Sequence, residues 1–208
     1  MFKNIINSWA SANGLVISQA QYDMLEAYKN RVLEVNKHMN LTAITSDEDF
    51  AVKHIIDSLT LLPFVPDGAR CIDIGTGAGF PGVVLRIMKD IRLTLLDSLR
   101  KRIVFLREAT DMLGLTDIDC VHSRAEQHKN TYQIATARAV ASLDKLVGYA
   151  LPLLEKDGVF LAMKGRDVGA EIEMAEGALR KYGGVVGSVE RVGIAEGVER
   201  SVVVVRRI

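Results

Sequence analysis

The stretch DIGTGAGFPG at residues 73–82 decides the fold of this 208-residue chain. It follows an apolar run, Cys71–Ile74, that is typical of a buried strand, and it leads into a helical segment at Pro81–Met88. Glycines at such a turn allow positive φ angles and let the backbone approach a ligand closely. The helix N-terminus that follows offers free N–H groups to an anion. The stretch therefore predicts a ligand site at the carboxyl edge of a parallel sheet.

Strand-like runs alternate with helical segments beyond this stretch. The expected strands are Cys71–Ile74, Arg92–Leu96, Ile118–Val121, Gln133–Ala137 and Gly158–Met163, and the expected helices are Pro81–Met88, Leu99–Leu113, Ser142–Leu153 and Val168–Tyr182. Two β-rich runs close the chain, Val185–Val192 and Ser201–Arg206, joined by a turn containing Gly193 and Gly197. This order predicts an α/β fold, with a mostly parallel sheet covered on both faces and a terminal antiparallel hairpin.

The part of the chain before the glycine stretch is predicted to be helical. Ser18 begins one helix with a capping box, and Ser46 caps a second helix that ends before Pro66. We therefore expect a helical extension at residues 1–66, packed on an α/β domain at residues 67–208.

Composition narrows the class of protein. Lysine and arginine total 26, as do aspartate and glutamate, so the net charge is zero and argues against binding nucleic acid or membrane by bulk charge. Two cysteines exclude a disulfide scaffold, and their spacing indicates no metal site. No apolar stretch approaches the length of a membrane span, and the N-terminus has no signal-peptide pattern. A cytoplasmic protein is expected.

Two adenosine cofactors compete for the glycine loop. Residues 77–82 satisfy the G-x-G-x-x-G pattern of dinucleotide binding. Residues 73–79 read D-x-G-x-G-x-G, which resembles the first motif of class I S-adenosylmethionine (SAM) methyltransferases. Asp97 closes the second strand and can accept ribose hydroxyls from either cofactor. Asp73, placed to organise the loop or attract the cofactor's ammonium, favours SAM, as do the terminal hairpin and the helical extension. A nicotinamide oxidoreductase stays the alternative.

A series of motifs extends the resemblance along nearly the whole chain. In order, they are Asn36–Thr42, His54–Leu59, Asp73–Gly82, Leu95–Ser98 with Lys101-Arg102, Ser123–Glu126, Arg138-Ala139 and Lys164-Gly165. The chain thereby resembles the small-subunit ribosomal RNA guanine-N7 methyltransferase family, also called glucose-inhibited division protein B. The resemblance implies methyl transfer from SAM, leaving S-adenosylhomocysteine, to a guanine of 16S rRNA near the decoding centre. A non-catalytic ribosome-binding factor with a relic pocket is a further alternative.

Cofactor-binding residues follow from the motifs. The resemblance implies contacts from Gly75, Phe80, Ala125, Glu126 and Arg138. The glycine stretch and the end of the second strand add Asp73, Thr76, Gly77, Asp97 and Ser98. Arg138 ends an otherwise apolar strand, and a cation there needs an anionic partner. That partner is the cofactor carboxylate, an RNA phosphate or a structural ion pair.

The expected chemistry needs little from the protein beyond orientation. Guanine N7 has a free lone pair and loses no proton on attack, so no general base is required. The position after the fourth strand reads Thr136-Ala137-Arg138-Ala139. It lacks the Asn-Pro-Pro-Tyr signature typical of enzymes that methylate exocyclic amines.

The guanine must still be positioned. Developing positive charge on the base favours a nearby acceptor or an aromatic face. The candidates are Asn40, His54, Asp57 and Phe80, with packing an equal alternative for His54 and Asp57. Lys164, after the fifth strand, is the foremost candidate for an RNA phosphate contact.

Further basic residues can extend an RNA track. They are Arg100, Lys101, Arg102, Arg107, Arg166, Lys29, Arg31 and Lys37. Because the net charge is zero, we expect a basic rim around the pocket on an otherwise neutral body. The expected partner is 16S rRNA within the small subunit or an assembly intermediate, and the protein is expected to be a monomer.

Overall fold

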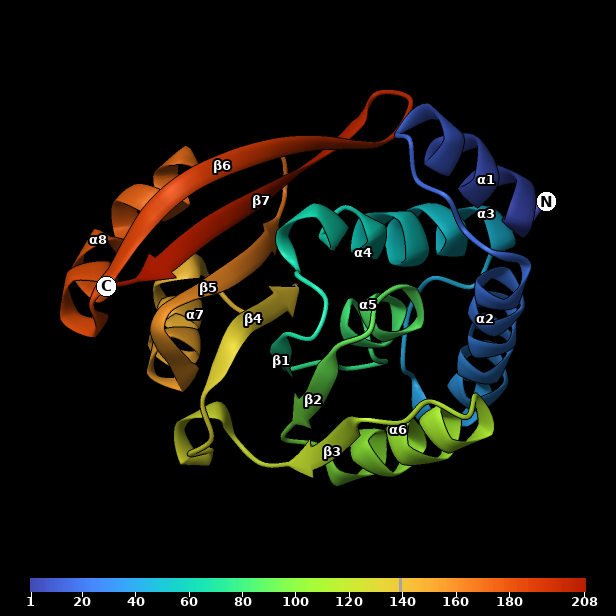
Figure 1. Ribbon diagram of the computed structural model, residues 1–208, viewed down its shortest axis with the longest axis horizontal. Helices are drawn as coiled ribbons and strands as arrows, with labels where there is room; N and C mark the ends of the chain where they lie inside the picture. The colour runs from blue at the N-terminus through green and yellow to red at the C-terminus, as the bar shows by residue number, and fades with distance from the viewer. Residues whose placement is uncertain (139) are drawn as a thin grey trace.

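A seven-stranded sheet with the order β3-β2-β1-β4-β5-β7-β6 runs through the computed structural model, which describes residues 1–138 and 140–208 (Figure 1). Its strands are β1 (Arg70–Ile74), β2 (Arg92–Asp97), β3 (Ile118–His122), β4 (Tyr132–Arg138), β5 (Leu154–Lys164), β6 (Gly184–Ala195) and β7 (Val198–Arg207). β1 to β5 pair in parallel, and β7 is antiparallel to both β5 and β6. The predicted fold class is confirmed. Ala139, from the Arg138-Ala139 motif, lies outside the described residues.

Two apolar clusters cover the two faces of the sheet. Successive residues of a strand point to opposite faces, so Cys71 belongs to one cluster and Ile72 to the other. The main helices are α2 (Gln19–Met39), α5 (Gly82–Met88) and α6 (Arg100–Met112) on the first face, and α7 (Leu143–Ala150) and α8 (Gly169–Tyr182) on the second. The sheet is thus buried on both faces, and ligands are left the edge where the strands end.

The glycine loop between β1 and α5 is held against the N-terminal helices. Gly75, Gly77 and Gly79 have φ angles of 65°, 61° and 84°. Tyr28 of α2 donates a hydrogen bond from its hydroxyl to Ala78 O at 2.6 Å. A Cβ at Gly79 would lie 2.1 Å from that hydroxyl, so the close approach of α2 requires glycine there. The division at residue 66 stays a prediction, although α2 packs directly on this loop.

The first helix, α1 (Phe2–Ala12), was not distinguished from its surroundings in the sequence. Its buried residues Phe2, Ile6 and Ala10 recur every fourth position, and that spacing is the signal that was available. The long hairpin of β6 and β7 reaches across the molecule to this helix (Figure 1). There Trp9 Nε1 donates to Gly193 O at 2.9 Å. Gly193 lies within β6, which continues to Ala195, so its predicted place in the turn was wrong.

The second N-terminal helix departs from a regular α-helix. Ser46 caps it as predicted, with Asp49 N donating to Ser46 Oγ at 3.2 Å. After α3 (Asp47–Phe50), however, the chain forms a π-helix, η1 (Ala51–Ile56), before α4 (Asp57–Leu59). Short helical turns complete the elements: η2 (Leu62–Phe64), η3 (Ala125–Gln127) and η4 (Leu151–Leu153). Short π segments occur often at functional sites, and this one carries His54. Among the described residues, no helix has the length and apolar character needed to cross a membrane.

Candidate active site

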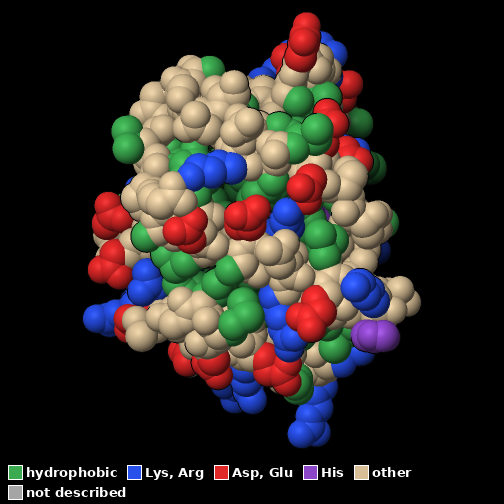
Figure 2. All heavy atoms as spheres, turned by 90° about the vertical axis from the view of Figure 1, so that its right-hand side faces the viewer, with side chains coloured by type: hydrophobic (Ala, Val, Ile, Leu, Met, Phe, Trp, Pro, Cys, Tyr) green, Lys and Arg blue, Asp and Glu red, His purple; other side chains and the backbone are tan. Residues whose placement is uncertain are grey.

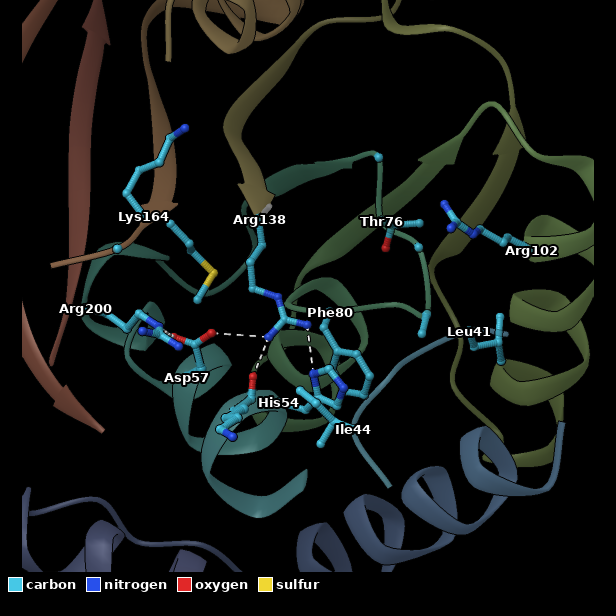
Figure 3. Close-up of a pocket in the computed structure, with 16 residues that line it drawn as sticks. Leu41, Ile44, His54, Asp57, Thr76, Phe80, Arg102, Arg138, Lys164 and Arg200 are labelled. Carbon is cyan, nitrogen blue, oxygen red and sulfur yellow. Dashed lines mark hydrogen bonds and ion pairs between the residues drawn. The ribbon is translucent and has the colours of Figure 1, made fainter. Parts of the chain in front are cut away.

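Two cavities lie side by side at the carboxyl edge of the sheet, and Gly75 lines both. The smaller, of about 190 Å³, is lined by Ile74, Gly75, Leu96, Asp97, Ser98, Ser123, Arg124, Ala125, Glu126, Val140 and Tyr149. The larger, of about 520 Å³, is lined by Leu41, Ile44, Lys53, His54, Asp57, Gly75, Thr76, Gly77, Ala78, Phe80, Arg102, Arg138, Met163, Lys164, Gly165 and Arg200 (Figure 3). We call them the small and the large pocket. Most of the predicted site residues line one or the other.

Gly75 forms the boundary between the two pockets. A Cβ on this residue would lie 2.8 Å from Val140 Cγ2, and its φ of 65° is a conformation that other residues rarely adopt. At Gly75 the backbone therefore lines both cavities without a side chain in between. A ligand that spans the two pockets must pass this glycine.

Asp97 is the buried carboxylate of the small pocket, with 2% of its surface exposed. Its Oδ1 accepts from Leu99 N at 2.8 Å, and its Oδ2 accepts from Gly77 N at 3.0 Å and from Arg102 Nη1 at 3.2 Å. A carboxylate has about four acceptor positions, so about one stays free for a ribose hydroxyl. A second hydroxyl requires Arg102 to release its contact.

Asp73 lies beneath the glycine loop and is fully buried. Its Oδ2 accepts from Thr76 Oγ1 at 2.6 Å and Gly82 N at 3.1 Å, while its Oδ1 accepts from Thr136 Oγ1 at 2.9 Å. Burial raises the pKa of this carboxyl to about 6, and the hydrogen bonds oppose that rise. Of the two roles predicted for Asp73, these contacts fit the organisation of the loop.

The large pocket is lined mainly by cations. They are Lys53, Arg102, Arg138, Lys164 and Arg200. Asp57 is the one acidic residue on its wall among the described residues, and it lies 3.2 Å from Arg138 Nη1 and 3.7 Å from Arg200 Nε. Burial raises the pKa of Asp57, and the two arginines oppose that shift. Two cations share one carboxylate, which leaves net positive charge facing the cavity.

Arg138 is the most firmly held of these cations. Its Nη1 donates to Lys53 O at 2.6 Å and to Asp57 Oδ2 at 3.2 Å, and its Nη2 donates to His54 Nδ1 at 2.9 Å (Figure 3). The structural ion pair left open by the sequence is therefore present. It does not use all five N–H donors of the guanidinium.

His54 is buried between aromatic rings and Arg138. Its ring stacks on Phe80 with parallel planes and centroids 4.4 Å apart, and Phe50 meets it edge-on at 4.8 Å. Burial, and after it the charge of Arg138, lower the pKa of His54 to about 3. The imidazole is consequently neutral, and both of its faces and nitrogens are engaged in packing and hydrogen bonds.

Some of the predicted contacts lie elsewhere. Asn40 is the left-handed C-cap of α2 (φ 51°), is exposed and does not line either pocket. Lys164 lines the large pocket, but its Nζ is bound to Glu171 at 2.7 Å and to Ala141 O at 2.8 Å. Its side chain is only 9% exposed, so Glu171 would have to release Lys164 before it could meet a phosphate, and that contact stays a prediction.

Several residues of the predicted RNA track are also committed to contacts within the protein. Lys29 is buried, bonded to Asp47 at 2.6 Å, and Arg31 pairs with Glu34 and Glu108. Burial and pairing of these side chains stabilise the helical extension instead of presenting it to a ligand.

Arg200 and Lys53 were missed in the sequence. Arg200 precedes the apolar run Val202–Val205 of β7, and because β7 is antiparallel to β5, the start of β7 lies at the edge where β4 and β5 end. Lys53 gave no comparable signal, because a lysine next to an exposed helical turn is usually solvated. Its position on the pocket wall results from the π-helix.

One face of the surface carries charge of both signs. Figure 2 shows acidic and basic side chains intermingled on the face that forms the right-hand side of Figure 1, the side of α2 and α6. By contrast, cations outnumber acids on the wall of the large pocket. Within a sequence of zero net charge, positive charge is therefore concentrated on the wall of the large pocket, and the wider basic rim stays a prediction.

The pockets fit SAM in kind. The small pocket supplies a buried carboxylate, Asp97, for ribose, and the exposed Glu126 lies across it. The bare backbone of Gly75 leads to the large pocket, where Arg138 offers donors suited to a carboxylate. Among the described residues, no cluster of three metal-ligating side chains is present.

The sequence is similar to a defined group of proteins. A sequence model of the GidB family, described as rRNA small subunit methyltransferase G, matches residues 21–203. Ribosomal RNA small subunit methyltransferase G of Clostridium botulinum (strain ATCC 19397 / Type A) is 40% identical over 217 residues, covering 100% of this chain and 91% of the relative. The protein of that name from Alkaliphilus metalliredigens (strain QYMF) is 42% identical over 193 residues, covering 88% and 81%.

Solved structures share the fold at low sequence identity. A SAM-dependent methyltransferase from Aquifex aeolicus superposes with a TM-score of 0.59 at 19% identity, covering 76% of this chain and 93% of that one. M. jannaschii TYW2 in complex with AdoMet gives a TM-score of 0.59 at 15% identity, covering 74% and 76%. At such identities the likeness concerns the fold alone.

Proposed function

Because the chain belongs to the GidB family of rRNA small subunit methyltransferase G, it is a SAM-dependent enzyme that methylates 16S rRNA, and we propose that it acts on N7 of a guanine. The family decides against the nicotinamide oxidoreductase and against a non-catalytic factor. One observation carries the proposal for N7. Among its described residues, the large pocket has Asp57 as its one carboxylate, and the position after β4 lacks the Asn-Pro-Pro-Tyr signature typical of enzymes that methylate exocyclic amines.

The small pocket is proposed to hold the adenosine half of the cofactor. Asp97 accepts from the ribose, and Ala125 with Glu126 borders the adenine. Gly75 lets the chain of the cofactor pass into the large pocket, where the free donors of Arg138 meet its carboxylate. SAM supplies a methyl group already activated on a sulfonium. What this chain adds is orientation of donor and acceptor, which can account for a large part of the rate.

The large pocket is proposed to receive the guanine and the phosphates beside it. Net positive charge on its wall, with Arg200 one-third exposed at the mouth, suits an anionic backbone. N7 carries a lone pair toward the methyl group, and no proton has to leave. Transfer moves positive charge from sulfur to the base, and Asp57 is the acidic group on that wall able to offset it.

The partner is proposed to be 16S rRNA within a folded small subunit or an assembly intermediate, at a guanine near the decoding centre. The charge distribution supports this, because cations gather on the wall of the large pocket, whereas acidic and basic side chains are intermingled on the face shown in Figure 2. We propose that the protein acts as a monomer in the cytoplasm, where this substrate is found.

Label transfer tests the proposal. The protein is incubated with methyl-labelled SAM and small subunits that lack the modification, and the RNA is digested to nucleosides. We expect the label in 7-methylguanosine, and more of it from subunits than from unfolded 16S rRNA. Label in a different nucleoside, or none from a preparation that binds S-adenosylhomocysteine, would contradict the proposal.

A further inference from the structure

The segment between α2 and α3, whose Leu41 and Ile44 line the large pocket, is also bonded to one buried histidine of that pocket. Thr42 Oγ1 lies 2.8 Å from His54 Nε2, and Ile44 N donates to the same hydroxyl at 3.0 Å. Asn36 Oδ1 in turn accepts from Thr42 N at 2.9 Å. These contacts tie the Asn-Leu-Thr motif to the π-helix that carries His54. The Asn-Leu-Thr motif therefore has a structural role, holding His54 through Thr42, which the sequence alone did not indicate.

The contacts of His54 define which nitrogen carries the proton. Arg138 Nη2 is only a donor, so His54 Nδ1, 2.9 Å away, is the acceptor. Nε2 then carries the proton and donates it to Thr42 Oγ1. A doubly protonated ring would place a second cation against Arg138 and would remove its acceptor.

The guanidinium of Arg138 retains two donors. Three of its five N–H groups point to Lys53 O, Asp57 Oδ2 and His54 Nδ1. The Nε–H and one Nη2–H have no hydrogen-bond partner among the described residues. Because His54 occupies one hydrogen of Nη2, its position determines where the other hydrogen points.

We infer that His54 is the positioning residue for Arg138, holding the guanidinium so that its two remaining donors meet the methionine carboxylate of the cofactor. The inference rests on the proposed function, which places that carboxylate in the large pocket. Phe80 supports it from the other side, because the stacked rings, 4.4 Å apart, prevent the imidazole from turning. Thr42 keeps the proton on Nε2. The helical extension thus takes part in cofactor binding without touching the cofactor.

Two substitutions of His54 separate its two hydrogen bonds. Asparagine places its oxygen near the position of Nδ1, and glutamine places its amide near that of Nε2. His54→Asn therefore keeps an acceptor for Arg138, whereas His54→Gln keeps a donor for Thr42. By calorimetry with S-adenosylhomocysteine, we expect Kd within about threefold of wild type for His54→Asn and raised about tenfold for His54→Gln, the loss of one charged hydrogen bond. Equal losses, or the reverse order, would overturn the inference.

A double-mutant cycle shows whether His54 acts through Arg138. In an Arg138→Gln background we expect His54→Gln to change Kd by less than about twofold, because the group it positions is absent. Losses that simply add would mean that His54 only packs against Phe80, and the inference would fall. Should His54→Gln not fold, Thr42→Val carries the same test, with a loss of about threefold that disappears in the Arg138→Gln background.

A matched control completes the experiment. His128→Gln changes another partly buried histidine, which bonds to Tyr132 outside both pockets, and its Kd should equal that of wild type. Because these measurements need no RNA, they are independent of the methylated nucleoside. A wild-type chain that shows the coupling but labels no 7-methylguanosine would end the proposed function alone, whereas normal labelling with additive losses would end this inference alone.

Discussion

The small and the large pocket share Gly75 yet are built on opposite principles. The small pocket is formed by the ends of β1, β2 and β3 with the loops that follow them, and acidic Asp97 and Glu126 lie on its wall. The large pocket gathers side chains from the π-helix, α6, β4, β5 and β7, and five of them are cations. One cavity is thus suited to hydroxyl and amino donors and the other to phosphates and a carboxylate.

The two pockets differ because one is built from elements of the common fold and the other from segments added to it. The small pocket arises from local sequence, because the glycine loop and Asp97 occupy fixed places in the strand-loop-helix unit. The large pocket depends on the helical extension and the terminal hairpin, which are additions to that unit. Cofactor and RNA affinity should therefore respond to different substitutions.

The largest effect is expected at the shared glycine. Gly75→Asp would force a Cβ to within 2.8 Å of Val140 and place a negative charge between the pockets. With the added strain of positive φ, we expect S-adenosylhomocysteine binding and methyl transfer to fall at least about a thousandfold. Gly114→Asp, at another positive-φ glycine with open space around it, controls for backbone strain alone. Retained transfer in Gly75→Asp would mean that the pockets are wrongly placed.

The small pocket should respond to Asp97 alone. Asp97→Ala removes the ribose acceptor and the partner of Gly77 N and Leu99 N, and we expect Kd for S-adenosylhomocysteine to rise about a hundredfold. RNA affinity, measured separately by filter binding, should stay within about twofold. A comparable loss in both affinities would mean that the two pockets do not act separately.

Asp73 lies beneath the glycine loop, and its burial should make the free energy of unfolding depend on pH. Its pKa is raised to about 6, so between pH 4 and pH 6 the folded protein binds a proton that the unfolded chain releases. Stability is therefore lost as pH rises through this window. Relative to wild type, Asp73→Asn should gain about 2 kcal/mol in unfolding free energy between pH 4 and pH 6.

Urea denaturation at several pH values measures this difference. Asp67→Asn, at an exposed position, is the matched control and should show no such trend. A pH-independent difference for Asp73→Asn would contradict the raised pKa of the buried carboxyl.

The smallest effect is expected at Arg200 in the large pocket. Arg200→Met keeps the apolar stem and removes a cation that makes no hydrogen bond within the described residues. We expect KM for small subunits to rise about tenfold at physiological salt and the salt dependence of binding to weaken by about one phosphate contact. Kd for S-adenosylhomocysteine should not change. Weakened cofactor binding instead would assign Arg200 to the small-molecule side of the pocket.

The sequence predicted the small pocket well because its elements are local. The glycine loop needs positive φ at fixed positions, and an acid at the end of the next strand faces it through the sheet register, which pairs Ile74 with Leu96. Both features depend on residues that are close together in the sequence, so a motif can identify them.

The large pocket was predicted only in part. Arg138, His54 and Asp57 were recognised as candidates, but not as one hydrogen-bonded group. Their pairing depends on the π-helix, which adds a residue to a turn and is not signalled by apolar periodicity. Lys164 and Lys29 were expected to face RNA, but they are buried in ion pairs with Glu171 and Asp47. Ion pairs between distant segments follow from tertiary packing, so sequence spacing alone did not indicate them.

A crystal structure with S-adenosylhomocysteine tests the separation of the two pockets most directly. We expect adenine beside Ala125 and Glu126 and ribose on Asp97. We expect the sulfur over Gly75, facing the large pocket, and the carboxylate on Arg138. Adenine bound among the cations of the large pocket, or a carboxylate that avoids Arg138, would contradict this arrangement.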